Sequence, residues 1–260
     1  MSPTVYLVSG ANRGIGLSLV TLLAARPDTI VFAGAREPAR ATDLQALATA
    51  HPNRVYPVKL ISADRASNAA AAEEIKKVGG KLDVIIANAA ISECIENMLG
   101  VPKEELVRHF EINSVGPLML FQAVWPLLKA SPAPKFVPIT SMVGSVEVGS
   151  LFDIDNIPYG TSKAALNWIT RKLHHDFPEL IMIEYPYRPP VAFPINPGTV
   201  ETDLLKNGRK DPKVVEALKT LPPITPEESA RGILEQVDKA TRETHDGQFV
   251  NYVGQERIPW

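Results

Sequence analysis

The sequence predicts a single α/β domain built around a parallel sheet, and three observations support this prediction. Short apolar runs typical of strands alternate with segments of helical periodicity, which is the pattern of βαβ units. Residues 84–87, Val-Ile-Ile-Ala, are apolar without alternation, as expected for a central strand that is buried on both faces. No internal repeat or low-complexity linker interrupts the 260 residues, so we expect one domain over residues 1–260.

The first half of the chain alternates strands with helices. We expect strands at residues 4–9, 29–33, 55–60 and 82–87, where short apolar runs occur. We expect helices at residues 15–25, 43–50 and 67–78, where apolar residues recur at helical spacing.

The second half continues the pattern with longer helices. We expect helices at residues 103–113, 114–129, 159–175 and 227–239, and strands at residues 136–140, 191–196 and 248–250. Residues 114–129 are apolar nearly all round, which predicts burial against the sheet. Many of the 23 prolines follow Pro178, which predicts long irregular loops in the last third of the chain.

The charge balance argues against several classes of function. Lys and Arg number 27 and Asp and Glu 29, for a net charge of −2, and no block of five like charges occurs along the chain. A nucleic-acid or membrane partner is therefore not expected. The sequence shows neither an export signal nor an apolar run long enough to span a bilayer, so we expect a cytoplasmic protein. The lone cysteine, Cys94, can form no internal disulfide, and no metal site is expected.

A glycine-bearing turn lies between the first strand and the first helix. Residues 10–16 read Gly-Ala-Asn-Arg-Gly-Ile-Gly. Glycines at such a turn let the backbone approach a pyrophosphate, which then binds the amides at the helix N-terminus. The spacing GxxxGxG differs from GxGxxG, and an ordinary βα turn is the alternative, but the position after the first strand favours dinucleotide binding.

The end of the second strand indicates which dinucleotide is bound. An acid at this point would accept a hydrogen bond from the ribose of NAD, but the residue there is Ala35, followed by Arg36. The guanidinium groups of Arg36 and Arg13 match the geometry of a 2′-phosphate. We therefore favour NADP(H), although both arginines could be solvated loop residues and Glu37 adjoins Arg36.

A tyrosine and a lysine four residues apart suggest proton-transfer chemistry. Tyr159 and Lys163 share one face of a helix, so the ammonium group could lower the pKa of the phenol. Ser141 follows a strand at the sheet edge where α/β proteins bind ligands, and its hydroxyl could donate to a substrate carbonyl. Each feature alone has a simpler reading, as a helix start or a cap.

Together these residues resemble the short-chain dehydrogenase/reductase family over essentially the whole chain. The resemblance rests on residues 10–16, Asn88-Ala89-Ala90, Asn113, Ser141, Tyr159 with Lys163, and residues 197–203. Within the family, the chain is most similar to fungal ketoreductases of the norsolorinic-acid type and to small carbonyl reductases. The resemblance implies a Rossmann-type, doubly wound, mostly parallel sheet of about seven strands. It also implies a homodimer or homotetramer that pairs helices 114–129 and 159–175.

The resemblance also implies a role for each site residue. Tyr159 is expected to donate the proton, Lys163 to bind the nicotinamide ribose, Ser141 to polarise the carbonyl, and Asn113 to hold a water behind Lys163. No metal is needed, because the cofactor supplies the hydride. The expected cofactor-binding residues are Gly10, Asn12, Arg13, Gly14, Ile15, Gly16, Arg36, Asp64, Asn88, Ala89, Tyr159, Lys163, Pro197, Gly198, Val200 and Thr202.

Three segments depart from the family pattern. Ala90 stands where the family usually has glycine, which could shift a backbone contact with the cofactor. Ile61 replaces the usual acid after the third strand, and Asp64 is the alternative adenine contact. Residues 181–190 resemble an insertion, which we interpret as a surface loop rather than an oligomer contact or a pocket wall.

The predicted activity is NADPH-dependent reduction of a ketone or aldehyde. The substrate walls are expected in residues 91–97, in residues 142–158 and after Thr202, and the apolar side chains of the second segment favour a hydrophobic or aromatic ketone. One alternative is a non-catalytic NADP(H)-binding sensor, which should have lost the serine, tyrosine or lysine. Another is an extended nucleotide-sugar epimerase or dehydratase, for whose appended substrate domain the chain leaves little room.

Overall fold

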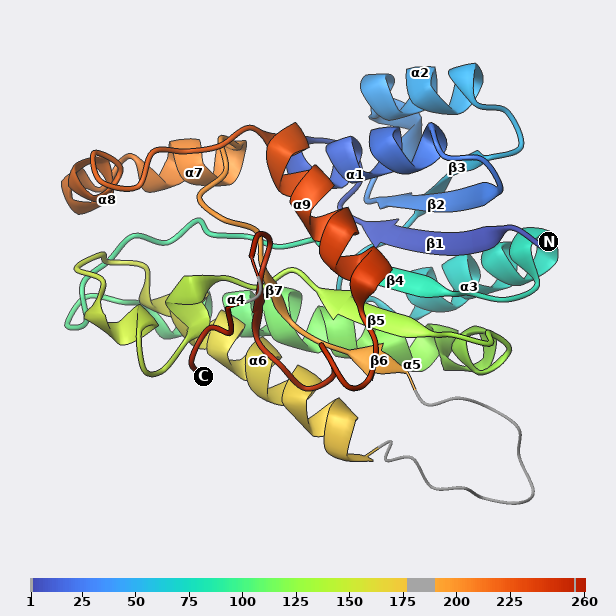
Figure 1. Ribbon diagram of the computed structural model, residues 1–260. Coiled ribbons are helices and arrows are strands. Elements are labelled where there is room, and N and C mark those ends of the chain that lie inside the picture. The colour runs from blue at the N-terminus through green and yellow to red at the C-terminus, as the bar shows by residue number, and fades with distance from the viewer. Residues whose placement is uncertain (1, 177–189, 255) are drawn as a thin grey trace.

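The structure is a computed structural model that describes residues 2–176, 190–254 and 256–260. Its main sheet has six parallel strands in the order β3-β2-β1-β4-β5-β6 (Figure 1). The strands are β1 (Thr4–Ser9), β2 (Thr29–Ala35), β3 (Val55–Lys59), β4 (Val84–Ala87), β5 (Lys135–Pro138) and β6 (Val191–Ala192). This order reverses between β1 and β4, which confirms the predicted doubly wound topology.

Helices cover both faces of the sheet (Figure 1). One face carries α1 (Gly14–Ala24), α2 (Thr42–Ala50) and α9 (Pro226–Lys239), and the other carries α3 (Arg65–Gly79), α5 (Gly116–Lys129) and α6 (Ile157–Asp176). Alternate residues of β1 enter the two cores: Tyr6 and Val8 join the first, and Val5 and Leu7 join the second. Because both faces are covered, β1 is apolar along nearly its whole length.

The strand expected at residues 191–196 is divided in two. Phe193 and Pro194 separate β6 from β7 (Ile195–Asn196), which pairs in parallel with β8 (Val250–Asn251). Pro194 has no N–H to donate to a sheet, although its carbonyl still accepts from the Val250 N–H at 3.0 Å. A bridge between Ile139 and Ile195 joins the small sheet to the large one, so β8 lies where a seventh strand was expected.

The two consecutive helices expected between residues 103 and 129 are joined by a π-helical turn. This turn, Glu111–Val115, connects α4 (Lys103–Phe110) to α5. Pro117 has no N–H, so it cannot make the α-helical hydrogen bond to the carbonyl of Asn113. The turn therefore leaves the Asn113 carbonyl without its usual helical partner, and π-helical turns are frequent at functional sites.

Among the described residues, the last third of the chain combines short helices with irregular segments. It contains α7 (Asp203–Gly208) and α8 (Pro212–Ala217), and irregular segments of the kind that the prolines predicted lie at residues 218–225 and 240–249. Pro212 is the first residue of α8, where a missing N–H costs nothing, and the Asp211 carboxylate accepts from the Lys213 N–H at 2.9 Å. Of the insertion expected at residues 181–190, only Pro190 falls within the described residues.

Within the described ranges, no helix combines the length and the apolar character that a bilayer crossing requires. Cys94 is buried.

Candidate active site

The residues expected to act together lie along the carboxyl edge of the sheet. The glycine turn follows β1, Asn88 and Ala89 follow β4, Ser141 follows β5, and residues 197–202 follow β7. Helix α6 brings Tyr159 and Lys163 to the same edge, because its first turns pack against the loop that follows Ser141. A Cβ atom on Gly144 of that loop would lie 2.6 Å from the Lys163 Cβ, so only glycine allows the loop and the helix to approach this closely.

Lys163 is almost completely buried, with 2% of its surface exposed. Its Nζ donates to the Ile139 carbonyl at 2.8 Å and lies 5.6 Å from the centroid of the Tyr159 ring. Burial disfavours the charged amine and lowers the pKa of Lys163 to about 7. This lysine can therefore gain or lose a proton near neutral pH.

Tyr159 has the opposite shift. Burial disfavours the phenolate and raises the pKa of Tyr159 to about 12, while a hydrogen bond with the Ser141 side chain lowers it in part. The sequence led us to expect that Lys163 would lower this pKa, but desolvation has the larger effect on both groups. Tyr159 is therefore protonated at neutral pH, which suits a proton donor.

The Asn113 side chain holds two neighbouring segments. Its Oδ1 accepts from the Ile91 N–H at 2.9 Å, and its Nδ2 donates to the Ile91 carbonyl at 2.9 Å and to Ser162 Oγ at 3.0 Å. These bonds fix the π-helical turn to α6 one residue before Lys163. Both Nδ2 hydrogens are used, and the Asn113 backbone carbonyl, which lacks its helical partner at Pro117, can accept a hydrogen bond from a water.

Two further asparagines, which the sequence analysis did not single out, hold the Ser141 loop from both sides. Asn167 accepts from Thr140 Oγ1 at 2.7 Å and donates to the Gly144 carbonyl at 3.1 Å. Asn196 accepts from the Met142 N–H at 3.0 Å. Asn167 lies one helical turn after Lys163, and this spacing was the only sequence signal that could have identified it.

The glycine turn adopts a conformation that requires glycine. Gly10 and Gly14 have φ angles of +66° and +55°, in the left-handed region. A Cβ on Gly16 would lie 2.2 Å from the Gly10 carbonyl oxygen, so the turn and the start of α1 are in direct contact. No side chain in the described structure caps the N-terminus of α1, so the first-turn amides remain available to an anion.

Asn88 and Ala89 bind the glycine turn rather than facing away from it. The Asn88 Nδ2 donates to the carbonyls of Ser9 and Gly10 at 3.0 and 3.2 Å. The backbone N–H groups of Asn88 and Ala89 both donate to Ser9 Oγ at 3.0 Å. The end of β4 therefore fixes the shape of the turn after β1.

The cations predicted to select the cofactor lie on the surface. Arg13 forms an ion pair with Asp203 at the start of α7, and Asp203 also pairs with Lys206. Arg36 is exposed directly after β2, and Glu37, its sequence neighbour, pairs instead with Arg40 at 3.0 Å. Asn12, also exposed, lies beside Arg13 in the same turn, while Ile15 packs on the core.

Asp64, the expected adenine contact, caps a helix. Its Oδ1 accepts from the Ser67 N–H at 2.6 Å at the start of α3, and the carboxylate is exposed. The Ser67 hydroxyl accepts from the Ile61 N–H at 2.9 Å, which ties the loop after β3 to the same helix.

The segment after β7 approaches the glycine turn. Gly198 has a φ of +82°, and the Pro197 carbonyl accepts from Ser229 Oγ of α9 at 2.7 Å. Thr202 Oγ1 donates to the Val200 carbonyl at 3.3 Å, and a Cβ on Gly14 would lie 3.3 Å from Thr202 Cγ2. The expected phosphate-binding turn and the expected nicotinamide-side loop therefore face each other.

The three expected substrate walls are joined to one another. A bridge connects Glu96 to Asn156, and Asn207 of α7 donates to the Ser92 carbonyl at 2.8 Å. Asp211, before α8, accepts from the Asp155 N–H at 3.1 Å. Two of the apolar residues counted in the second wall, Val146 and Leu151, point mainly to solvent, with exposures of 73% and 80%.

Comparisons with known proteins agree with this geometry. A family model described as short chain dehydrogenase matches residues 4–213. A norsolorinic acid ketoreductase of Aspergillus parasiticus is 34% identical over 99% of this chain and 91% of its own length. An uncharacterized oxidoreductase of Schizosaccharomyces pombe is 34% identical over 96% of each chain. Among solved structures, an NADPH-bound carbonyl reductase from chicken fatty liver has a TM-score of 0.83 and 29% identity over the whole of both chains.

Proposed function

We propose that this chain, which belongs to the short-chain dehydrogenase family, reduces a ketone or aldehyde to an alcohol with NADPH as its cofactor. The resemblance expected from the sequence, including that to fungal ketoreductases and carbonyl reductases, is thereby confirmed. The observation that carries the proposal is the gathering of Ser141, Tyr159 and Lys163 beside the glycine turn at one edge of the sheet. We propose that residues 1–260 form one catalytic domain.

The residues present suit a dinucleotide with a 2′-phosphate. The uncapped first-turn amides of α1 suit a pyrophosphate, with Gly10, Gly14, Ile15 and Gly16 beside it. Ala35 ends β2 without a carboxylate, and Arg36 follows it with no competing bond from Glu37. NADP(H) is therefore the better match than NAD(H). Further cofactor contacts are assigned to Asn12, Arg13, Asp64, Asn88, Ala89, Pro197, Gly198, Val200 and Thr202.

The protein supplies orientation and the proton. When bound, the dinucleotide supplies the hydride that reaches the carbonyl carbon. Ser141 donates a hydrogen bond to the carbonyl oxygen, and Tyr159 delivers its phenolic proton to that oxygen, giving the alcohol. Lys163, whose pKa is lowered to about 7, then passes a proton toward Tyr159. The Asn113 carbonyl holds the water that leads from Lys163 to solvent.

The raised pKa of Tyr159 keeps on the phenol the proton that reduction of a carbonyl needs. A tyrosine whose pKa is raised to about 12 is fully protonated at neutral pH, so it is ready to donate. Oxidation of an alcohol requires the phenolate instead, which burial disfavours.

The substrate class follows from the walls of the site. Val143, Val148 and Phe152 are partly buried in the loop beside Ser141, and the more exposed Val146 and Leu151 lie in the same loop. These apolar side chains favour a hydrophobic or aromatic ketone over a polyol.

A panel of carbonyl compounds tests this function. Oxidation of NADPH and NADH is followed by absorbance with aryl ketones, aliphatic ketones, aldehydes and quinones, and Tyr159→Phe is the control. Turnover that requires NADPH and is lost in the variant is the expected result. Tight NADPH binding without turnover of any substrate would instead favour the non-catalytic sensor.

We further propose that the protein is a cytoplasmic homodimer or homotetramer. The outward faces of α4 and α6 expose Val107, Phe110 and Trp168 by 54%, 47% and 66%. Apolar surface of this kind suits burial against a second copy. Light scattering should give a mass of two or four chains, and Trp168→Glu should lower it.

A further inference from the structure

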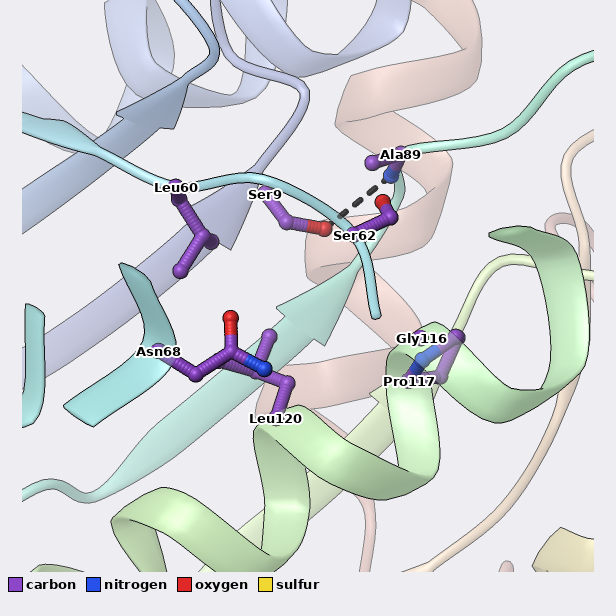
Figure 2. Close-up of a pocket in the computed structure, with 8 residues that line it drawn as sticks. All are labelled: Ser9, Leu60, Ser62, Asn68, Ala89, Gly116, Pro117 and Leu120. Carbon is purple, nitrogen blue, oxygen red and sulfur yellow. Dashed lines mark hydrogen bonds between the residues drawn. The ribbon is translucent and has the colours of Figure 1, made fainter. Parts of the chain in front are cut away.

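A small cavity lies beneath the loops at the carboxyl ends of β1, β3 and β4. It has a volume of about 20 Å³, is partly open, and is bordered by parts of β1, α3 and α5 and by the loops after β3 and β4. Its lining residues are Ser9, Leu60, Ser62, Asn68, Ala89, Gly116, Pro117 and Leu120 (Figure 2). The cavity is separate from the proposed catalytic residues, because its lining does not include Ser141, Tyr159 or Lys163.

An unpaired polar group faces this cavity. Asn68, in the first turn of α3, has only 2% of its surface exposed. Among the described residues, its Nδ2 is the one buried side-chain nitrogen or oxygen with no hydrogen-bond partner. An amide left unpaired in this way costs free energy, so a native structure needs an explanation for it.

Ser9 adds a second donor to the cavity. Its Oγ accepts from the N–H groups of Asn88 and Ala89, which occupies both of its lone pairs. The Ser9 hydroxyl can therefore only donate its own hydrogen. Figure 2 shows the Ser9, Ser62 and Asn68 side chains around the same space.

We propose that this cavity binds one ordered water molecule, held by Asn68, Ser9 and Ser62. The site offers at least two donors, so its ligand must accept hydrogen bonds, and the Ser62 hydroxyl can accept one in return. A volume of about 20 Å³ is enough to hold a water molecule. Water meets all three groups because it both accepts and donates.

The water has a structural consequence for the loop after β3. In that loop Ala63 has a φ of +59°, in the left-handed region that disfavours residues other than glycine. On its other side the loop rests on α5, where a Cβ on Gly116 would lie 3.1 Å from Ser62 Cβ. A water between Ser62 and Asn68 would fix the loop to α3. This step rests on the proposed function, because the loop then positions the adenine half of the dinucleotide.

Crystallography tests the water directly. In crystals of the full chain that diffract well enough to show other buried waters, we expect a density peak within about 3.2 Å of the Asn68 amide and the Ser9 hydroxyl. Such a structure without a peak at this place would overturn the proposal, whatever the protein catalyses.

The thermal stability of Asn68→Leu gives a second test, because the two states of the cavity predict shifts of opposite sign. If water satisfies the amide, the leucine displaces it and deprives Ser9 of an acceptor, so the melting temperature falls by about 2–4 °C. If the cavity is dry, the leucine removes an unpaired amide, and the melting temperature rises. Asn68→Ser, which keeps a polar group and leaves room for water, should fall between wild type and Asn68→Leu.

Cofactor binding tests the consequence for the loop. The dissociation constants of NADPH and of reduced nicotinamide mononucleotide, which lacks adenine, are measured for wild type and Asn68→Leu. We expect about threefold to tenfold weaker NADPH binding, with the mononucleotide unchanged. If Asn68→Leu weakened the binding of NADPH and of the mononucleotide equally, or left both unchanged, the proposed role of the water in positioning the loop would be overturned. Failure of wild type to bind NADPH would contradict the proposed function instead, and the crystallographic and thermal tests would still decide on the water.

Discussion

Two groups of polar residues at the carboxyl edge are held in different ways. Lys163, Asn113 and Asn167 are buried and bound by hydrogen bonds of 2.7–3.1 Å to backbone carbonyls, amides and hydroxyls. Arg13 and Asp203, at the mouth of the expected cofactor site, are exposed and joined by an ion pair. Buried hydrogen bonds hold one geometry, whereas exposed ion pairs contribute little and are screened by salt. The first group is therefore suited to holding reacting groups in place. In the second group, Arg13 can exchange its ion pair with Asp203 for a contact with the cofactor.

Removing the phenolic hydroxyl should have the largest effect. Tyr159→Phe removes the proposed proton donor and leaves the ring in place, so we expect kcat to fall by about 10²- to 10⁴-fold. NADPH affinity should stay within about twofold, because the variant retains the glycine turn and the surface arginines. Steady-state kinetics and fluorescence titration measure the two quantities. A kcat close to that of wild type would refute the assignment of Tyr159.

Replacing the buried lysine should change stability in a pH-dependent way. The pKa of Lys163 is lowered from 10.5 to about 7 by burial. Between those values the unfolded chain binds more protons than the folded one, so this group's contribution to stability increases as pH rises. Burial of the amine is thus most costly near and below pH 7 and costs little above pH 10.5.

We therefore expect Lys163→Met to raise the free energy of unfolding near pH 7. The gain should be roughly 3 kcal/mol, after allowance for the lost hydrogen bond to Ile139, and should shrink toward pH 10. Urea unfolding at several pH values measures it. A gain that does not vary with pH would mean that Lys163 is already protonated in the fold. The same variant should lose activity, which separates the stability cost from the catalytic role.

The sequence predicted some of these features better than others. The βα alternation, the glycine turn and the Tyr159–Lys163 spacing depend on local patterns, and all of them lie where expected. The contacts of Asn167 with Thr140 and Gly144 join segments more than 20 residues apart, so no local pattern reports them. The Arg13–Asp203 pair spans 190 positions and was equally hidden.

Backbone details were also beyond local patterns. The π-helical turn at Asn113 is explained by Pro117, because proline lacks the N–H that an α-helix would need at this position. The division of the strand at residues 191–196 follows in the same way from Pro194. The positions of Pro117 and Pro194 therefore explain backbone features near the site that the number of prolines alone does not.

Breaking the buried amide clamp should have an intermediate effect. Asn167→Leu removes the donor to the Gly144 carbonyl and leaves the Thr140 hydroxyl with only its 3.5 Å contact to the Lys163 carbonyl, at a cost of about 1–3 kcal/mol in stability. Because these residues flank Ser141, we expect kcat to fall by about tenfold with little change in KM. Asn167→Asp, which can still accept from Thr140, should recover part of kcat. A change in stability alone, with kcat unaltered, would reduce Asn167 to a purely structural role.

The smallest effect is expected at the exposed ion pair. Arg13 has one guanidinium group, and Asp203 would compete for it with the 2′-phosphate of NADPH. Asp203→Asn releases Arg13, so NADPH should bind about twofold to fivefold more tightly while NADH binding stays the same. The gain should shrink at high salt, because exposed charges are screened. Lys206→Met, which removes the other partner of Asp203 and keeps the Arg13 pair, is the matched control and should not tighten NADPH binding. If Asp203→Asn weakened the binding of NADPH and NADH equally, the Arg13–Asp203 ion pair would instead hold α7 against the glycine turn. The exposed group of residues would then, like the buried group, serve to fix the geometry of the site.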